Sequence, residues 1–65
     1  MTVERIGATN YANIYGIYNP AGEVIGTAEI VLAGRYTGNY FYTLSGKYTR
    51  KQIEKIFYSA RRETA

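Results

Sequence analysis

Residues 19–22, with the sequence NPAG, constrain the fold of this chain more than any other segment. Asparagine favours the first position of a type I turn, proline presets φ at the second, and glycine accepts the positive φ that follows. A type I turn followed by a left-handed glycine joins two antiparallel strands. We therefore predict a β-hairpin whose strands cover about residues 10–18 and 23–33, with Tyr18 opposite Val24.

This register divides the hairpin into two faces of different chemistry. One face has no charge, and we predict that it forms the core. Its residues are Ala12, Ile14, Gly16, Tyr18, Val24, Gly26, Ala28 and Ile30. The other face is polar and aromatic, and we predict that it stays open, with Asn13 opposite Glu29. Its residues are Tyr11, Asn13, Tyr15, Ile17, Ile25, Thr27, Glu29 and Val31.

A pair of glycines stands inside the predicted core face, where Gly16 and Gly26 would lie opposite each other. Glycine weakens the interior of a strand unless the missing side chain leaves room for something else. The pair therefore predicts that a helix or another backbone comes close at this point of the sheet.

A third strand is predicted at about residues 39–45, between two glycines. Its connection to the hairpin has an even number of residues, whether it is a two-residue turn or a four-residue loop. Both alternatives place Phe41 on the core face, and Tyr40 and Tyr42 on the open face. An odd loop or a bulge would invert this assignment.

Residues from about 50 to 62 are predicted to form an amphipathic helix. Thr49 and Gln52 have the spacing of a capping box, in which the two side chains satisfy backbone N–H groups reciprocally. An apolar stripe at the spacing i, i+3, i+4 and i+7 is suited to covering one face of a sheet. The stripe consists of Ile53, Ile56, Phe57 and Ala60. The opposite side of the helix carries Lys51, Lys55, Tyr58 and Arg62.

Together these elements predict an α+β domain, a three-stranded antiparallel meander with one C-terminal amphipathic helix packed on one face. Residues 2–8 alternate weakly and leave two alternatives open, a fourth edge strand or an ordered tail. No linker or repeat interrupts the 65 residues, so a single domain is expected. The layout resembles that of sheet-reading DNA-binding modules such as integrase arm-binding domains. This likeness concerns the layout alone and assigns no role to any residue.

The composition argues against an enzyme. The chain has no cysteine, histidine or aspartate, and its five glutamates are scattered. General acid–base chemistry near neutral pH favours histidine or carboxylates in a cleft, and a serine nucleophile needs a neighbouring base. Metal sites need clusters of carboxylate, imidazole or thiolate ligands. We therefore expect a non-enzymatic protein without a metal or other cofactor.

Length and hydropathy bear on self-association and on where in the cell the protein is expected. A chain this short buries only about 60% of the surface that its unfolded form exposes, and self-association is one way to add stability. The longest apolar run, AEIVLAG, contains a glutamate and is too short to span a bilayer. The first ten residues lack the pattern of a secretory signal peptide. We expect a cytoplasmic protein without membrane contact, and leave open whether it forms a homo-oligomer.

Positive charge is concentrated at the C-terminal end. Of the net charge of +3, residues 1–46 contribute −1 (two Arg against three Glu) and residues 47–65 contribute +4 (six Lys or Arg against two Glu). Such an asymmetry favours an anionic partner, although an ordinary solvated helix face carries similar charges. Because Lys51, Lys55 and Arg62 would repel one another along the helix, pairing within the helix does not explain their spacing.

Two candidate binding surfaces follow, the tyrosine-lined open face and the basic side of the helix. Tyrosine rings on an open sheet can stack on nucleobases. Tyrosine and arginine also anchor protein interfaces, and tyrosine is in any case a good strand former. The candidate binding residues are Tyr11, Tyr15, Arg35, Tyr40, Tyr42, Lys47, Lys51, Lys55, Tyr58 and Arg62.

We predict from these surfaces a small module that binds nucleic acid, either DNA or RNA. The alternative is a protein-interaction or inhibitor module, of the kind found among phage and plasmid accessory proteins. Such a module could form a homodimer through the tyrosine-lined face.

Overall fold

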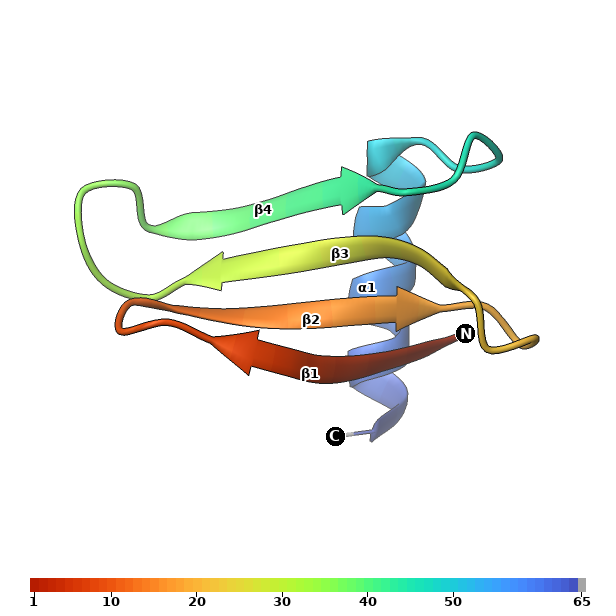
Figure 1. Ribbon diagram of the computed structural model, residues 1–65, viewed down its shortest axis with the longest axis horizontal. Helices are drawn as coiled ribbons and strands as arrows, with labels where there is room; N and C mark the ends of the chain where they lie inside the picture. The colour runs from red at the N-terminus through yellow and green to blue at the C-terminus, as the bar shows by residue number, and fades with distance from the viewer. Residues whose placement is uncertain (65) are drawn as a thin grey trace.

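A computed structural model describes the backbone of residues 1–64 and the side chains of residues 1–61. The elements along the chain are β1 (Thr2–Ala8), β2 (Ala12–Tyr18), β3 (Val24–Val31), β4 (Gly38–Thr43) and α1 (Arg50–Thr64). The strands form one antiparallel sheet in the order β1-β2-β3-β4, and α1 packs against one of its faces (Figure 1). The predicted α+β class is confirmed. Of the two alternatives for residues 2–8, the structure has the fourth edge strand.

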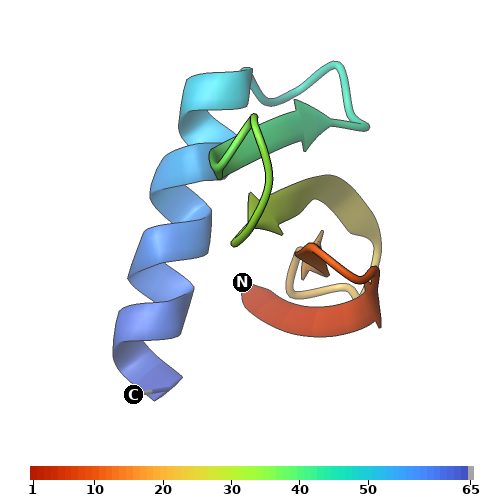
Figure 2. The same ribbon diagram turned by 90° about the vertical axis from the view of Figure 1, so that its left-hand side faces the viewer.

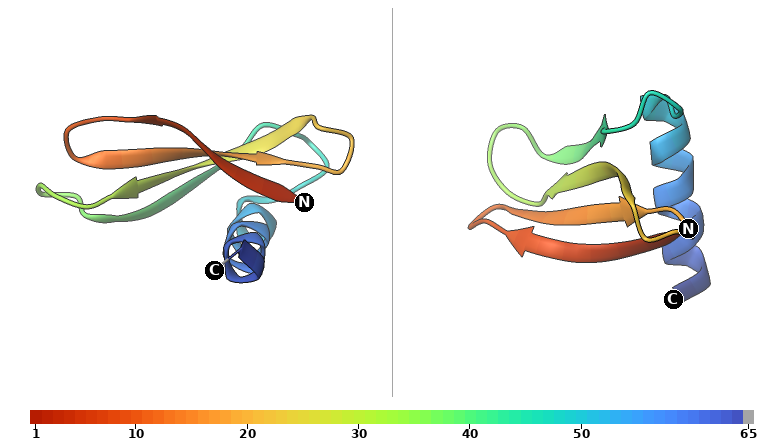
Figure 3. Two further views of the ribbon diagram at one scale, coloured as in Figure 1. Left: turned by 90° about the horizontal axis from the view of Figure 1, so that it is seen from below. Right: turned by 45° about the vertical axis from the view of Figure 1, so that its right-hand side comes forward.

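The helix covers one end of the sheet more than the other. It crosses the strands near the start of β1 and the end of β2 (Figure 1), and the sheet twists strongly along its length (Figures 2 and 3). The β1–β2 and β3–β4 loops lie together at the opposite end of the sheet, away from α1 (Figure 3).

The loop between β2 and β3 forms the predicted turn. The N–H of Gly22 donates to the carbonyl oxygen of Asn19 over 2.9 Å, and Gly22 has a φ of 85°. The N–H of Asn19 donates to the carbonyl oxygen of Glu23 over 2.9 Å. The side-chain oxygen of Asn19 accepts the N–H of Glu23 over 2.9 Å. Both the backbone and the side chain of Asn19 thus hydrogen-bond to the residues at the other end of the loop, as expected for asparagine at the first turn position.

A β-bulge at Ile25 shifts the register of the hairpin. Tyr18 faces Val24 as predicted, but Ile17 faces Gly26, so that Ile25 is an extra residue in β3. Because side chains alternate along a strand, one extra residue moves the remaining pairs to the other face. The predicted pairing is therefore wrong from Ile17 to the start of β2.

As a consequence, the side of β2 that faces the helix is the side that was predicted to be open. Tyr15 faces Ala28, which in turn faces Phe41, and this row lies under α1. The residues of β2 that were predicted to form the core lie on the face away from α1, and they are Ala12, Ile14, Gly16 and Tyr18. The predictions for Ala28 and Phe41 are confirmed, since both are buried against the helix.

Three further core assignments change for the same reason. Ile17 and Ile25 were predicted to be on the open face, but both are buried in the core. Val24 was predicted to be in the core, but its side chain is exposed. A bulge brings two successive side chains of one strand to the same side. At this bulge Ile25 and Gly26 both face the helix, which places the larger of the two in the core.

The core lies between α1 and the covered end of the sheet. Its buried residues are Ile17, Ile25, Ala28, Phe41, Ile53 and Phe57. The Phe57 ring meets the rings of Tyr15 and Phe41 edge to face, with centroids 5.4 Å apart in both pairs. The predicted apolar stripe of the helix is confirmed, because Ile53 and Phe57 are almost fully buried in this core.

The helix begins with the predicted capping box. The N–H of Thr49 donates to Oε1 of Gln52 over 2.8 Å, and the N–H of Gln52 donates to Oγ1 of Thr49 over 3.2 Å. The helix ends two residues beyond the predicted boundary, at Thr64. Within residues 1–64, no helix combines the length and the apolar character that crossing a membrane would require.

Candidate functional site

The structure divides the candidate residues between different sides of the molecule. Four of them line one concavity on the face away from α1, and these are Tyr11, Arg35, Tyr40 and Tyr42. Four lie on or next to the helix, and these are Lys47, Lys51, Lys55 and Tyr58. The side chain of Arg62 lies outside the described residues. The last candidate, Tyr15, lies between the sheet and the helix.

The prediction that Tyr15 belongs to the open face is wrong. Its ring packs edge to face against Phe57, and the guanidinium carbon of Arg61 lies 5.2 Å from its centroid. The bulge at Ile25 is the physical reason, because the extra residue reverses which side of β2 faces the helix. Tyr15 is therefore part of the packing between sheet and helix and does not belong to the candidate site.

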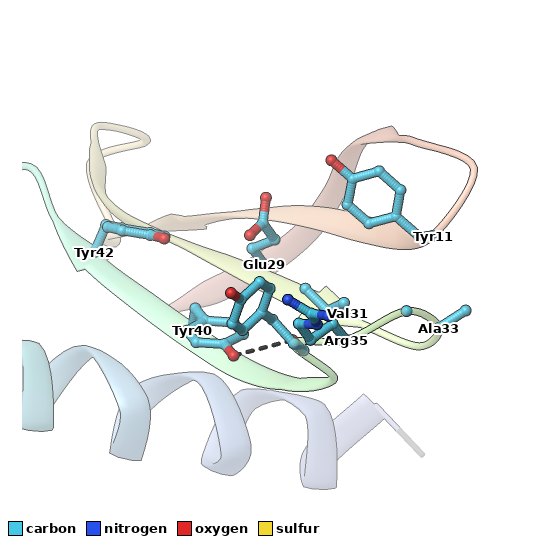
Figure 4. A pocket seen from close by; sticks show the side chains of 9 residues that line it. Tyr11, Glu29, Val31, Ala33, Arg35, Tyr40 and Tyr42 are labelled. Atoms are coloured by element: carbon cyan, nitrogen blue, oxygen red, sulfur yellow. Dashed lines mark hydrogen bonds between the residues drawn. The ribbon is translucent and has the colours of Figure 1, made fainter.

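The concavity on the open face has a volume of about 520 Å³, which is within the range of ligand sites. It is named the tyrosine pocket below. Its lining residues are Tyr11, Glu29, Val31, Ala33, Gly34, Arg35, Tyr36, Tyr40 and Tyr42. They come from the β1–β2 loop, from β3, from the β3–β4 loop and from β4, and they gather toward the loop end of the sheet (Figure 4).

One wall of the pocket is held in place by Tyr40. Its ring lies over Gly38, and a Cβ at Gly38 would be in van der Waals contact with it, 3.8 Å from the hydroxyl oxygen. The Tyr40 hydroxyl donates a hydrogen bond to the carbonyl oxygen of Tyr36 over 3.0 Å. The ring is thus supported along its side and fixed at its end, so this wall is formed before any ligand arrives.

Glu29 lies at the centre of the pocket. It stands between Ile14 of β2 and Tyr40 of β4 in the sheet, and its side chain points away from the helix (Figure 4). The prediction that it lies on the tyrosine face is correct, but its partner on β2 is Ile14 and not Asn13. The side chain is half-buried, and among residues 1–61 its carboxylate has no hydrogen-bond or ion-pair partner.

The exposed rings of Tyr11 and Tyr42 stand on either side of Glu29 (Figure 4). Arg35 is the one cationic residue of the pocket lining in the described part of the chain, and its side chain extends beside Tyr40 and Val31 (Figure 4). Arg35 and Glu29 share the pocket without forming an ion pair with any residue from 1 to 61. The pocket therefore contains both signs of charge in an uncompensated form.

Two charged or aromatic members of this pocket, Tyr36 and Glu29, were not among the binding residues predicted from the sequence. Tyr36 was not a candidate because it lies in a segment that resembles an ordinary glycine-flanked turn, although its ring is exposed at the pocket. Glu29 was predicted to project from the tyrosine-lined face, but it was not named as a binding residue. The sequence signal that could have marked Glu29 as a binding residue is that it is the only charged residue between Val24 and Ala33.

The second surface is basic and lies at the start of α1. Its exposed residues are Lys47, Arg50, Lys51 and Lys55, and they are named the basic helix surface. Sequence reasoning missed Arg50, whose signal was its place between Lys47 and Lys51 in one basic run. The half-buried Glu54 lines a groove beside β4 together with Arg50 and Lys51. The four cations of this surface therefore outnumber the carboxylate that lies among them.

Tyr58 connects the helix to the edge strand β4. Its hydroxyl accepts a hydrogen bond from the side-chain nitrogen of Asn39. Its ring packs edge to face against Phe41 and Phe57, with centroids 5.7 Å and 5.5 Å away. The side chain is partly exposed beside the basic helix surface, but these contacts also give it a role in holding the helix to the sheet.

The described residues contain no group of three or more acidic, histidine or cysteine side chains that could hold a metal ion. No family model, curated protein or solved structure matches this chain. Within the described residues, the tyrosine pocket and the basic helix surface are the two candidate binding surfaces. These two surfaces face in different directions, since one lies on the sheet face away from α1 and the other on α1 and the segment before it (Figures 1 and 4).

Proposed function

We propose that this chain is a non-enzymatic binding module whose tyrosine pocket holds a protein partner. The observation that carries the proposal is the gathering of four exposed tyrosines around one concavity. Tyr11, Tyr36, Tyr40 and Tyr42 are 54%, 71%, 38% and 51% exposed. Tyrosine is enriched at protein interfaces because it buries a large area and loses few rotatable bonds when it does so.

The charges of the open face favour a protein over a nucleic acid at this site. Glu29 lies inside the pocket. Glu4 of β1 is on the same face, because it lies in one cross-strand row with Thr27 and Tyr42. Nucleic-acid affinity depends on neutralising phosphates with cations, so two carboxylates against Arg35 weigh against that ligand here.

A peptide selection tests the proposal. Phage-displayed peptides are selected on the wild-type protein and counter-selected on the Tyr40→Ser/Tyr42→Ser variant, whose fold is checked by thermal unfolding. We expect the selected peptides to bind the variant at least about tenfold more weakly by calorimetry, since tyrosine anchors typically carry about 2 kcal/mol or more. The matched control is Lys51→Ala/Lys55→Ala, which should bind as the wild type does.

Three results would contradict the proposal. The first is that the selection enriches no peptide that binds the wild-type protein. The second is that selected peptides bind the wild type and the tyrosine variant equally well. The third is that a photo-crosslinker in the peptide reacts with the basic helix surface and not with the pocket.

Self-association through the same face is a special case in which the protein partner is a second copy of this chain. Light scattering tests it directly. In that case the wild type forms dimers at high concentration, and the Tyr40→Ser/Tyr42→Ser variant should be monomeric at the same concentration. A wild type that remains a monomer leaves a different protein as the partner of the pocket.

A second candidate function is nucleic-acid binding by the basic helix surface. The specific observation in its favour is the charge at the start of α1. Arg50 and Lys51 lie in the first turn, which contains no acidic residue. Cations at a helix N-terminus oppose the helix dipole, whereas an anion there is stabilised by it. An anionic partner such as a phosphate would offset this unfavourable arrangement.

A further inference from the structure

Glu29 is a half-buried carboxylate that lacks a partner within the described residues. It belongs to a pocket whose other walls are mostly tyrosine rings and aliphatic groups. A charge that leaves water is stabilised only when it is paired or hydrogen-bonded. Any ligand that fills the pocket removes water from this carboxylate, so a ligand that supplies a positive charge is favoured over one that does not.

The tyrosine rings around Glu29 also favour a positively charged ligand. The face of a tyrosine ring carries negative electrostatic potential and attracts alkylammonium and guanidinium groups. Tyr11 and Tyr42 stand on either side of the carboxylate, and Tyr40 is fixed beside it by its hydrogen bond to the loop (Figure 4). The carboxylate and the rings thus favour a cation independently of each other.

We propose that the tyrosine pocket binds a cationic side chain of the protein partner, an alkylammonium or a guanidinium, with Glu29 as its counter-ion. This inference rests on the proposed function, because it names the chemistry that the partner presents. The volume of about 520 Å³ accommodates one lysine or arginine side chain, including a methylated one, together with part of the neighbouring backbone.

Arg35 allows the sign of the charge to be tested within the same pocket. It lies on the lining without forming an ion pair with Glu29. If the ligand is a cation, Arg35 repels it, and removing Arg35 should leave the affinity unchanged or raise it. If the ligand is an anion, Arg35 is its partner, and removing Arg35 should abolish binding.

The experiment compares three short peptides that differ at one side chain: lysine, trimethyllysine, and a neutral isostere in which a tert-butyl group replaces the trimethylammonium. Binding is followed by NMR titration of the backbone amides. We expect the two cationic peptides to shift amides around the pocket. The neutral isostere should bind about tenfold more weakly, because it has the same shape without the charge.

Two variants complete the experiment, Glu29→Gln and Arg35→Ala. We expect Glu29→Gln to weaken trimethyllysine binding about tenfold and Arg35→Ala not to weaken it. Amide dispersion and thermal unfolding show whether each variant is folded. The comparison between charged and neutral peptides needs no variant, so the inference can be tested even if Glu29→Gln fails to fold.

Three results would overturn the inference. They are equal binding of the charged and neutral peptides, no binding of either cationic peptide, and loss of binding in Arg35→Ala with retention in Glu29→Gln. The peptide selection above is independent of these results, because it tests whether the pocket binds a protein segment at all. A pocket that binds selected peptides but ignores their charge would support the proposed function and refute the counter-ion role of Glu29.

Discussion

Gly26 of β3 and Ile53 of α1 are in such close contact that a side chain on the glycine would overlap the isoleucine. A Cβ at Gly26 would lie 2.9 Å from both Cδ1 and Cγ2 of Ile53, and 2.7 Å from the carbonyl oxygen of Tyr42. The helix can approach the sheet this closely because residue 26 has no side chain. The prediction that a helix comes close at Gly26 is therefore confirmed, whereas Gly16 lies on the other face of the sheet.

The first prediction concerns Gly26→Ala, which should lower the free energy of unfolding by about 1–3 kcal/mol, as overpacking of a core typically does. The matched control is Gly16→Ala, whose nearest obstacle is the Tyr18 hydroxyl, at 2.7 Å. That hydroxyl is the end of a side chain that can rotate away, so Gly16→Ala should lower the free energy of unfolding by less than Gly26→Ala does. Urea unfolding measures the free energy of unfolding of both variants. If both lose the same amount of stability, the close approach of the helix is not the cause of the loss in Gly26→Ala.

The second prediction concerns Phe57→Ala, which should cost about 3–5 kcal/mol of stability, enough to unfold a chain of marginal stability. Phe57 is almost fully buried and contacts the rings of Tyr15, Phe41 and Tyr58. Circular dichroism during thermal unfolding checks the result. The control is the exposed Lys55→Ala, and a variant at Phe57 that melts like this control would refute the packing described.

The third prediction concerns the capping box. Thr49→Ala removes the acceptor of the Gln52 N–H and should cost about 1 kcal/mol. Thr49→Ser keeps the hydroxyl and should retain most of the stability. If denaturant unfolding finds the serine variant as unstable as the alanine variant, the hydroxyl does not contribute through its hydrogen bond.

Local signals made part of the fold predictable. The turn at residues 19–22 and the capping box at Thr49 each depend on a few adjacent side chains, and both form as predicted. The bulge at Ile25 has no such signal. It depends on packing between distant segments, because it turns Ile17 and Ile25 together toward the helix. One inserted residue was enough to exchange the sides of β2.

The same reasoning explains which site residues were predictable. Tyr40 and Tyr42 lie on β4, whose pairing with β3 follows the predicted parity, so both lie on the expected face. Tyr15 lies on β2, and its assignment was wrong because of the bulge. Tyr36 could not be assigned from its neighbours, because only the fold of the β3–β4 loop brings it to the pocket.

The fourth prediction tests the second candidate function. If the basic helix surface binds duplex DNA, the logarithm of the affinity should fall linearly with the logarithm of salt concentration, with a slope of about −0.9 per phosphate contacted. Lys51→Ala/Lys55→Ala should then reduce the magnitude of the slope by about 1.8. Fluorescence anisotropy at several salt concentrations measures this. The control Glu54→Gln removes no cation and should not reduce the slope, and an unchanged slope in the lysine variant would exclude these residues.

The fifth prediction concerns the hydrogen bond from Tyr40 to the carbonyl oxygen of Tyr36. Tyr40→Phe keeps the ring over Gly38 but removes this link to the β3–β4 loop. Because the bond is exposed to solvent, the free energy of unfolding should change by no more than about 1 kcal/mol.

The larger effect of Tyr40→Phe should be on motion and binding. Backbone order parameters from NMR relaxation should fall for residues 35–37, since the hydrogen bond ties this part of the loop to the ring. Peptides that bind the tyrosine pocket should bind more weakly, because the loop must then be ordered on binding. Unchanged order parameters together with unchanged peptide affinity would show that Tyr40 contributes its ring alone, and that the hydrogen bond does not preorganise the pocket.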